Sequence, residues 1–282
     1  MKKYLTIPAL FAAATLSVQA TTVHNGLVNY WALDGNGDDT AGDFAGNTSS
    51  EANTAVVEIG TNEVATGGVS IESTGGLFGG AGAFERTDST GAAGNTNGRL
   101  AVADSTDVQF GGGDLTISLW AQFDDNDTAW QTVISKGEGS EYRLGAQNNT
   151  DNVNYAGGLG DANGASDIQV SGQWFHILAT TENGGNTQVF VDGVLIDTNT
   201  GTAGIVNDTT DLWIGNNPES AARQWDGLID DVAQWDRVLT NDEITEIFAA
   251  GELGISLGQI PEPSSSLLLG LSGLMIAIRR RR

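Results

Sequence analysis

Apolar and polar residues alternate over many short stretches of the chain, which is the pattern of half-buried β-strands. The clearest stretch runs from Asp114 to Phe123, where every second residue from Leu115 onward is apolar and would line a core. The pair Asp192-Gly193 lies between two apolar runs and predicts a tight hairpin turn. The same reasoning predicts strands at residues 26–33, 55–59, 68–71, 83–84, 99–103, 131–136, 141–145, 153–159, 168–171, 173–181, 187–191, 194–196 and 212–215.

The segment 225–248 predicts one more buried strand and then a short amphipathic helix. Thr240 and Glu243 have the spacing of a capping box, in which each side chain binds the other residue's backbone N–H at a helix start. Apolar residues then recur at helical spacing, and Gly251 is expected to end the helix.

Many short strands, regular turn signals and one late helix indicate an all-β protein. We predict an antiparallel two-sheet jelly-roll sandwich with one short C-terminal helix. At 282 residues the chain fits one large domain of this class, which can form its core without disulfides, and the sequence contains no cysteine.

The first 20 residues have the layout of a secretory signal peptide. Two lysines precede an apolar run from Leu5 to Leu16, and the small residues Val18 and Ala20 suit signal peptidase. We expect cleavage after Ala20, so residues 1–20 would be absent from the mature protein.

The C-terminus combines a Pro-Glu-Pro motif, an apolar run over residues 264–278 and a terminal arginine cluster. A 15-residue helix spans about 22 Å, less than the roughly 30 Å hydrocarbon core, which argues against a permanent anchor. The arginines would hold this end in the cytoplasm. The motif residues are Pro261, Glu262, Pro263, Arg279, Arg280, Arg281 and Arg282.

This C-terminal layout resembles the PEP-CTERM sorting tag, which we assign to residues 259–282. The resemblance implies recognition and processing by an exosortase-type enzyme in a Gram-negative bacterium. The chain would be held briefly at the inner membrane and then reach the cell surface or the extracellular matrix.

The order of the apolar motifs also resembles a known fold family. GAF at 82–84, LTISLW at 115–120, GQWFH at 172–176, VFVDG at 189–193 and GLIDDV at 227–232 follow one another as in laminin-G-like domains of the concanavalin A type. The resemblance implies a laminin-G-like domain, for which we expect the bounds 21–258.

The predicted domain is strongly acidic. Of the 12 basic residues, two lie in the leader and four in the tail, so six accompany 35 of the 36 acidic residues in the body. Such a surface repels nucleic acid and anionic lipid and attracts divalent cations. A saline habitat is an equally good explanation of this composition.

Acidic residues after the first strand are candidates for a calcium site. Asp34, Asn36 and Asp38 have the spacing that opens an EF-hand loop, but Asp39 and Ala45 replace the residues that such a loop requires. In the resembled family a structural calcium often ties this loop to the last strand. We therefore predict a calcium site formed by Asp34, Asp39 and Asp230, the alternative being that Asp230 accepts backbone hydrogen bonds and the loop acids are solvated.

Catalytic motifs are not evident. No Glu-x-Asp pair of the laminarinase type occurs in the sequence, and no Gly-x-Ser-x-Gly or phosphate-binding glycine motif is present. His24 and His176 lack a nucleophile motif nearby, and capping explains Glu243 and Glu246. The sequence therefore predicts a protein that is not an enzyme.

Seven tryptophans are the best candidates for ligand contacts. Five lie in strand patterns and are expected in the core, whereas Trp130 and Trp225 follow polar loops and are predicted as exposed ligand contacts. We predict a non-catalytic, carbohydrate-binding protein whose partner is a polysaccharide or another extracellular polymer. The alternatives are a structural or adhesive matrix protein and, more remotely, a glycoside hydrolase. The five expected core tryptophans are Trp31, Trp120, Trp174, Trp213 and Trp235.

Overall fold

The structure is a computed structural model that describes residues 23–58, 68–85, 98–124, 128–138, 141–158, 160–201 and 203–261. Fifteen strands, one α-helix and four short 3₁₀ helices are formed by these residues. The strands are β1 (Leu27–Trp31), β2 (Val56–Glu58), β3 (Val69–Glu72), β4 (Ala81–Phe84), β5 (Arg99–Val102), β6 (Leu115–Phe123), β7 (Thr132–Ser135), β8 (Tyr142–Ala146), β9 (Asn152–Gly157), β10 (Asp161–Ala165), β11 (Trp174–Thr181), β12 (Asn186–Val191), β13 (Val194–Thr200), β14 (Leu212–Ile214) and β15 (Gly227–Trp235). The helices are α1 (Asn241–Glu252), η1 (Ala41–Asp43), η2 (Thr106–Val108), η3 (Ala221–Arg223) and η4 (Leu257–Gln259).

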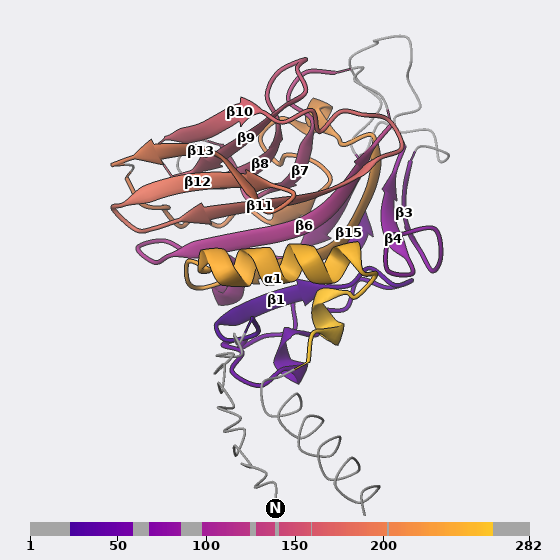
Figure 1. The fold of residues 1–282 in the computed structure, drawn as a ribbon, viewed down its shortest axis with the longest axis horizontal. Coiled ribbons are helices and arrows are strands. Elements are labelled where there is room, and N and C mark those ends of the chain that lie inside the picture. The colour runs from indigo at the N-terminus through magenta and orange to yellow at the C-terminus, as the bar shows by residue number, and fades with distance from the viewer. Residues whose placement is uncertain are drawn as a thin grey trace, which may run out of the picture.

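The strands form two antiparallel sheets that pack face to face, as Figure 1 shows. Sheet A has eight strands in the order β13-β12-β11-β6-β15-β4-β3, with β1 also paired to β15, and sheet B has seven in the order β10-β9-β8-β7-β14-β5-β2. The alternation in β6 has the predicted effect, since Leu115, Ile117 and Leu119 are fully buried in the main core. The predicted jelly-roll sandwich is confirmed.

Strand β15 pairs with three other strands of sheet A. It pairs with β6 along most of its length, with β4 through its first half and with β1 through its second half. The register with β6 shifts between Asp230 and Ala233, and Asp231 adopts a left-handed backbone conformation with φ of 55°. This bulge places two consecutive acidic side chains in buried positions.

Helix α1 begins with the predicted capping box between Thr240 and Glu243. The helix continues through Gly251, however, so the prediction that this glycine ends it is wrong. A Cβ at Gly251 would lie 2.1 Å from Cζ2 of Trp120 on sheet A. The glycine is therefore required for the close approach of the helix to the sheet, and a second core forms between them and the chain ends.

One strand prediction is wrong, and the prediction of the hairpin turn is confirmed. Residues 168–171 form no strand, and the segment 161–165, which lacks apolar alternation, pairs with β9 as β10 instead. The Asp192-Gly193 turn is confirmed, because both residues have positive φ and join the paired residues Val191 and Val194.

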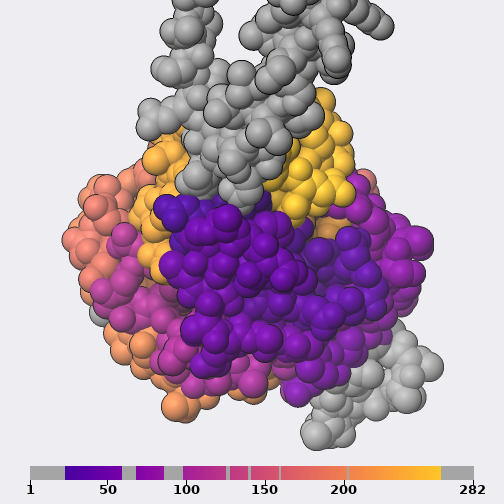
Figure 2. Space-filling model, turned by 90° about the horizontal axis from the view of Figure 1, so that it is seen from below, coloured from indigo at the N-terminus to yellow at the C-terminus, as the bar shows by residue number. Residues whose placement is uncertain are grey.

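The two ends of the described chain meet on one side of the molecule, where Nε2 of His24 lies 3.0 Å from the carbonyl of Leu257. In Figure 2 the indigo N-terminal part borders the yellow C-terminal part on this side. The predicted signal peptide and the tag residues from Glu262 onward lie outside the described residues, and Pro261 is exposed. None of the helices in the described ranges has the length and hydropathy needed to span a membrane.

Candidate functional site

The outer face of sheet B is built from side chains of neighbouring strands. Along these strands, Leu144, Leu212 and Ile214 point into the main core and are fully buried. The residues that alternate with them in each strand therefore point to the opposite, outer face. The strand register places a row of outward residues across the sheet. This row contains Ala101, Trp213, Ser135, Arg143, Ala156 and Asp161.

Trp130 lies in the segment that leads into β7, close to Arg143 of this row. It is partly exposed, has a φ of 64° and donates its backbone N–H to the carbonyl of Asn148 at 3.2 Å. The guanidinium carbons of Arg143 and Arg223 lie 5.3 Å and 5.8 Å from the centroid of its ring. Trp130 is thus accessible, and its predicted part in ligand binding stays a prediction.

Glu138 fixes the two arginines around Trp130. It accepts a hydrogen bond from Nη1 of Arg143 at 2.6 Å, and its other oxygen accepts from Arg223 and, at 2.6 Å, from Nδ2 of Asn217. We call Trp130, Glu138, Arg143, Asn217 and Arg223 the Trp130 platform. Its polar groups hold one another in place, so the surface is ordered before any ligand binds.

Trp213 is a second aromatic group on this face. It is partly exposed, and the guanidinium carbon of Arg99 lies 4.0 Å from its ring centroid. The sequence predicts Trp213 in the core because it lies in a strand pattern, and this prediction is wrong. The strand alternation seen in β14, with Leu212 and Ile214 inward, shows that Trp213 has to point outward.

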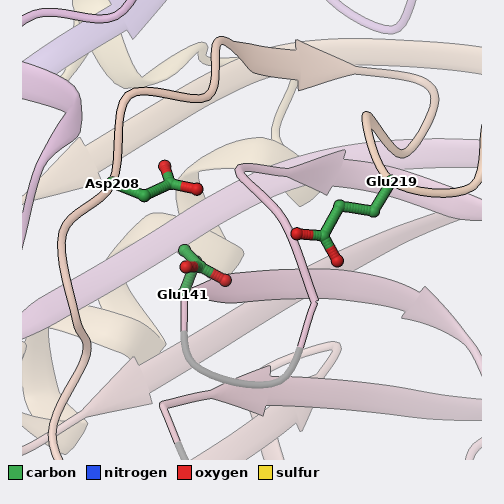
Figure 3. Close-up of side chains that lie close together, drawn as sticks. All are labelled: Glu141, Asp208 and Glu219. Atoms are coloured by element: carbon green, nitrogen blue, oxygen red, sulfur yellow. The ribbon is translucent and has the colours of Figure 1, made fainter.

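Three acids come together beside the platform, as shown in Figure 3. One carboxylate oxygen from each of Glu141, Asp208 and Glu219 lies within 4.8 Å of the others, the only such group of three found in the described part of the chain. Burial first, and then repulsion by Glu141, Glu138 and Asp208, raises the pKa of Glu219. The three residues come from separate loops, so sequence spacing offered no signal for the cluster.

The predicted calcium residues Asp34, Asp39 and Asp230 do not form one site. Asp39 accepts hydrogen bonds from the backbone N–H groups of Tyr30 at 2.8 Å and Ala41 at 3.0 Å. It therefore shapes the turn after β1, and the three-residue set is wrong in including it.

Asp34 and Asp230 are both bound by the loop before β4. Asp34 accepts from the N–H of Gly80 at 2.6 Å, and Oδ2 of Asp230 accepts from the N–H groups of Leu77 and Phe78 at 2.9 and 3.0 Å. The other Asp230 oxygen is buried without a partner, and burial, followed by repulsion from Asp231 and Asp34, raises the pKa of Asp230 to about 7. An orphaned buried carboxylate oxygen fits a hard cation, but these residues supply only two carboxylates.

Trp225 is part of the core, so its prediction as an exposed contact is wrong. Only 1% of the residue is exposed, its ring packs edge-on against Phe123 at 5.2 Å, and its Nε1 donates to the carbonyl of Gln122 at 3.1 Å. The polar loop therefore ends before Trp225, and the Trp225 side chain lies in the main core between the two sheets.

Comparison with known families confirms both resemblances. The profile described as the concanavalin A-like lectin/glucanases superfamily matches residues 94–245, and the PEP-CTERM protein-sorting motif matches residues 259–282. The sorting motif implies export and processing at a membrane. A comparison with curated proteins gives no significant match.

Several solved binding domains share the fold. The binding domain of Botulinum neurotoxin DC in complex with rat synaptotagmin II is 16% identical, with a TM-score of 0.56 over 81% of this chain and 52% of that chain. The same toxin domain in complex with SialylT is 16% identical, with a TM-score of 0.55 over 81% and 52% of the two chains. This chain thus spans about half the length of those toxin domains.

A sugar complex is also among the similar structures. Domain 4 of AbnA, a GH43 extracellular arabinanase from Geobacillus stearothermophilus, in complex with arabinotriose, is 16% identical, with a TM-score of 0.52 over 78% of this chain and 97% of that domain. At such identities the likeness concerns the fold alone.

Proposed function

The chain belongs to the concanavalin A-like lectin/glucanases superfamily, and from this premise we propose that it is an exported, non-catalytic protein that binds carbohydrate at the cell surface or in the extracellular matrix of a Gram-negative bacterium. The observation that carries the proposal is the Trp130 platform on the outer face of sheet B.

The platform has the chemistry that a sugar ring requires. A sugar presents an apolar C–H face and a rim of hydroxyl groups, which the partly exposed Trp130 indole and the partly exposed charged groups of Glu138 and Arg223 match. Arg143 and Asn217 are buried and hold Glu138 from beneath. Because Glu138 already holds Arg143 and Arg223, little side-chain entropy is lost when a ligand binds. The complex of the AbnA domain with arabinotriose supports this choice, whereas the complex of the toxin domain with synaptotagmin II is equally compatible with the adhesive alternative.

A glycan-binding test can use the full chain. We expect retention on at least one polysaccharide of a glycan array, with Trp130→Ala and Glu138→Gln each lowering affinity tenfold or more. Trp174→Ala is the matched control, since Trp174 is also partly exposed but lies on sheet A. Equal losses from Trp130→Ala and Trp174→Ala would count against the platform, and no retention on any glycan would favour the adhesive alternative.

Two sets of side chains are the candidates for catalysis: the pair His176 and Ser118, and the three clustered acids. His176 is fully buried against Ser118, with Nε2 2.8 Å from its Oγ, and burial lowers the pKa of His176 to about 3, so this pair is closed to substrate and the ring is neutral. The Glu141, Asp208 and Glu219 cluster is the place where glycan hydrolysis could occur, since its acids are close and one has a raised pKa. Release of reducing ends from a bound polysaccharide, abolished by Glu219→Gln, would establish the enzyme instead.

We also propose that calcium stabilises the domain, with Asp230 and Asp34 as ligands near the loop before β4. The unpartnered oxygen of Asp230 supports this assignment. Calcium should raise the melting temperature of the full chain, and Asp230→Asn should remove this response while Glu219→Gln keeps it. The reverse pattern would move the ion to the acidic cluster, and no response in any variant would refute calcium binding.

Sorting has its own test. Deleting Pro261 to Arg282 should redirect the protein away from the membrane and the cell surface, as measured by fractionation. Unchanged localisation would refute the sorting proposal.

A further inference from the structure

The residues that lead into the sorting tag belong to the folded domain. Leu257 and Ile260 are 3% and 6% exposed, and both contribute to the second core beside Val23, Leu27 and residues of α1. The core thus extends two residues beyond the predicted domain boundary at 258. Pro261, the first residue of the Pro-Glu-Pro motif, follows the last core residue directly.

One buried carboxylate fastens this segment to the start of the domain. Oδ2 of Asp231 accepts the backbone N–H of Leu257 at 2.7 Å, and its Oδ1 accepts the hydroxyl of Tyr30 in β1. The same hydroxyl accepts the backbone N–H of Gly258 at 3.2 Å. We call Tyr30, Asp231, Leu257 and Gly258 the C-terminal clasp.

Aromatic packing on the N-terminal side adds to the C-terminal clasp. Nε2 of His24 lies 3.0 Å from the carbonyl of Leu257, and its ring stacks on Phe44 at 4.4 Å. A Cβ at Gly258 would lie 3.0 Å from the Tyr30 ring, so the chain passes closely over that ring. In Figure 2 the C-terminal residues lie against the N-terminal ones on this face.

No linker therefore separates the domain from its tag. The sorting-motif match begins at residue 259, inside η4, where the backbone N–H groups of Gln259 and Ile260 bind the carbonyls of Ser256 and Leu257. The Ile260 side chain is buried, whereas Gln259 is exposed but held in this backbone conformation, and Pro261 is exposed. An enzyme that processes a peptide needs the backbone in an accessible, extended form, which a folded segment offers only when it opens locally.

We propose that the C-terminal clasp shelters the start of the sorting tag, so that the membrane-embedded processing enzyme reaches this part of the tag only in molecules whose clasp has opened. The inference rests on the proposed sorting function. When opening and closing are fast, the processing rate follows the population of the open form.

A linker insertion separates this effect from the stability of the domain. Eight Gly and Ser residues inserted between Ile260 and Pro261 leave the C-terminal clasp intact but move the tag away from it. In a host that carries the processing enzyme, pulse-chase labelling of the full chain should show tag removal tenfold or more faster in the linker variant. Tyr30→Phe should also accelerate removal in the native chain, and it should add nothing in the linker variant.

The control is Tyr155→Phe, which removes another buried tyrosine hydroxyl. This hydroxyl binds Thr181, and Tyr155 belongs to β9 of sheet B and to the main core, not to the second core beside the C-terminal clasp. It should leave the processing rate unchanged. The inference is overturned if the linker variant is processed at the native rate or more slowly, or if Tyr155→Phe accelerates processing as much as Tyr30→Phe. If the native chain is not processed at all, the sorting proposal itself fails.

Discussion

Replacing Tyr30 by phenylalanine should destabilise the domain in a pH-dependent way. The substitution keeps the ring and its edge-on contact with Phe44 at 5.7 Å, and removes only the hydroxyl. That hydroxyl donates to Asp231 and accepts from Gly258, so the buried carboxylate of Asp231 and the partly buried N–H of Gly258 lose a partner. The effect therefore reports on the C-terminal clasp and not on packing.

The magnitude follows from these two contacts. A hydrogen bond to a charged group contributes about 1.5 to 3 kcal/mol, and a buried N–H left without a partner costs about 1 to 3 kcal/mol. Because Gly258 is only partly buried, its N–H is assigned the lower value, about 1 kcal/mol. We expect a loss of about 3 kcal/mol in the free energy of unfolding at pH 8. For a domain of this size, the melting temperature should fall by about 6 to 12 °C.

The loss should shrink as the pH falls. Burial raises the pKa of Asp231 to about 6, while the N–H of Leu257 and the hydroxyl of Tyr30 oppose this shift. Because the folded pKa lies above the ordinary value near 3.9, stability linked to Asp231 is complete below pH 4 and is lost as the pH rises through 6. Removing the hydroxyl raises this pKa further, so the penalty of Tyr30→Phe is larger at pH 8 than at pH 5.

Thermal unfolding by circular dichroism at pH 5 and pH 8 measures both effects. At pH 5 the loss should approach about 2 kcal/mol, with about 1 kcal/mol for a neutral hydrogen bond to Asp231 and about 1 kcal/mol for the Gly258 N–H, which loses its partner at either pH. Tyr155→Phe, whose hydroxyl contacts the neutral Thr181, should lose about 1 kcal/mol at both pH values. A Tyr30→Phe penalty that is the same at both pH values, or no larger than that of Tyr155→Phe, would refute the proposed role of Asp231.

Three further substitutions test other parts of the structure. Trp225→Ala should cost about 3 to 5 kcal/mol in urea unfolding because the ring is buried; a loss below 1 kcal/mol would contradict its place in the core. Gly251→Ala should lower the melting temperature, with a cost of about 1 to 3 kcal/mol, because its Cβ would meet Trp120; the usual stabilisation of a helix by alanine would argue against that contact. Without calcium, Asp230→Asn should stabilise the domain at pH 8 by up to about 4 kcal/mol and leave its stability unchanged at pH 4. The reason is that the pKa of Asp230 is raised to about 7 in the folded protein, so stability is lost as the pH rises through 7. A gain that does not depend on pH would show that the charge of Asp230 is not its cause.

The fold could be predicted from the sequence because its signals are local. Alternation in β6, the Asp-Gly turn and the capping box of α1 each depend on residues close together in the chain. The misassigned elements depend on distant contacts. Strand β10 forms by pairing with β9 despite its polar sequence, and Gly251 is required by Trp120, which lies far away in the sequence.

The candidate site was less predictable for the same reason. Trp130 was identified because its polar surroundings made burial unlikely on composition, but nothing local marked Glu138 as the group that joins two arginines. Trp225 had similar flanking residues and is buried, because exposure there is decided by where the chain enters the sandwich. Polar flanks alone therefore cannot separate a surface tryptophan from a core one.

The bulge in β15 directs the side chains of Asp230 and Asp231 to two different segments of the chain. Without the register shift, consecutive strand residues would point to opposite faces, and one of Asp230 and Asp231 would enter the main core. The left-handed conformation of Asp231 lets it meet Tyr30 and Leu257 while Asp230 binds the loop before β4. The first strand, the loop before β4 and the segment leading to the tag are thus fixed by two adjacent carboxylates, and the raised pKa of each records the cost of burying them together. A cation at Asp230 would relieve part of that cost and would also offset the repulsion between Asp230 and the adjacent Asp231, so the effects of calcium and of the C-terminal clasp on stability should be coupled.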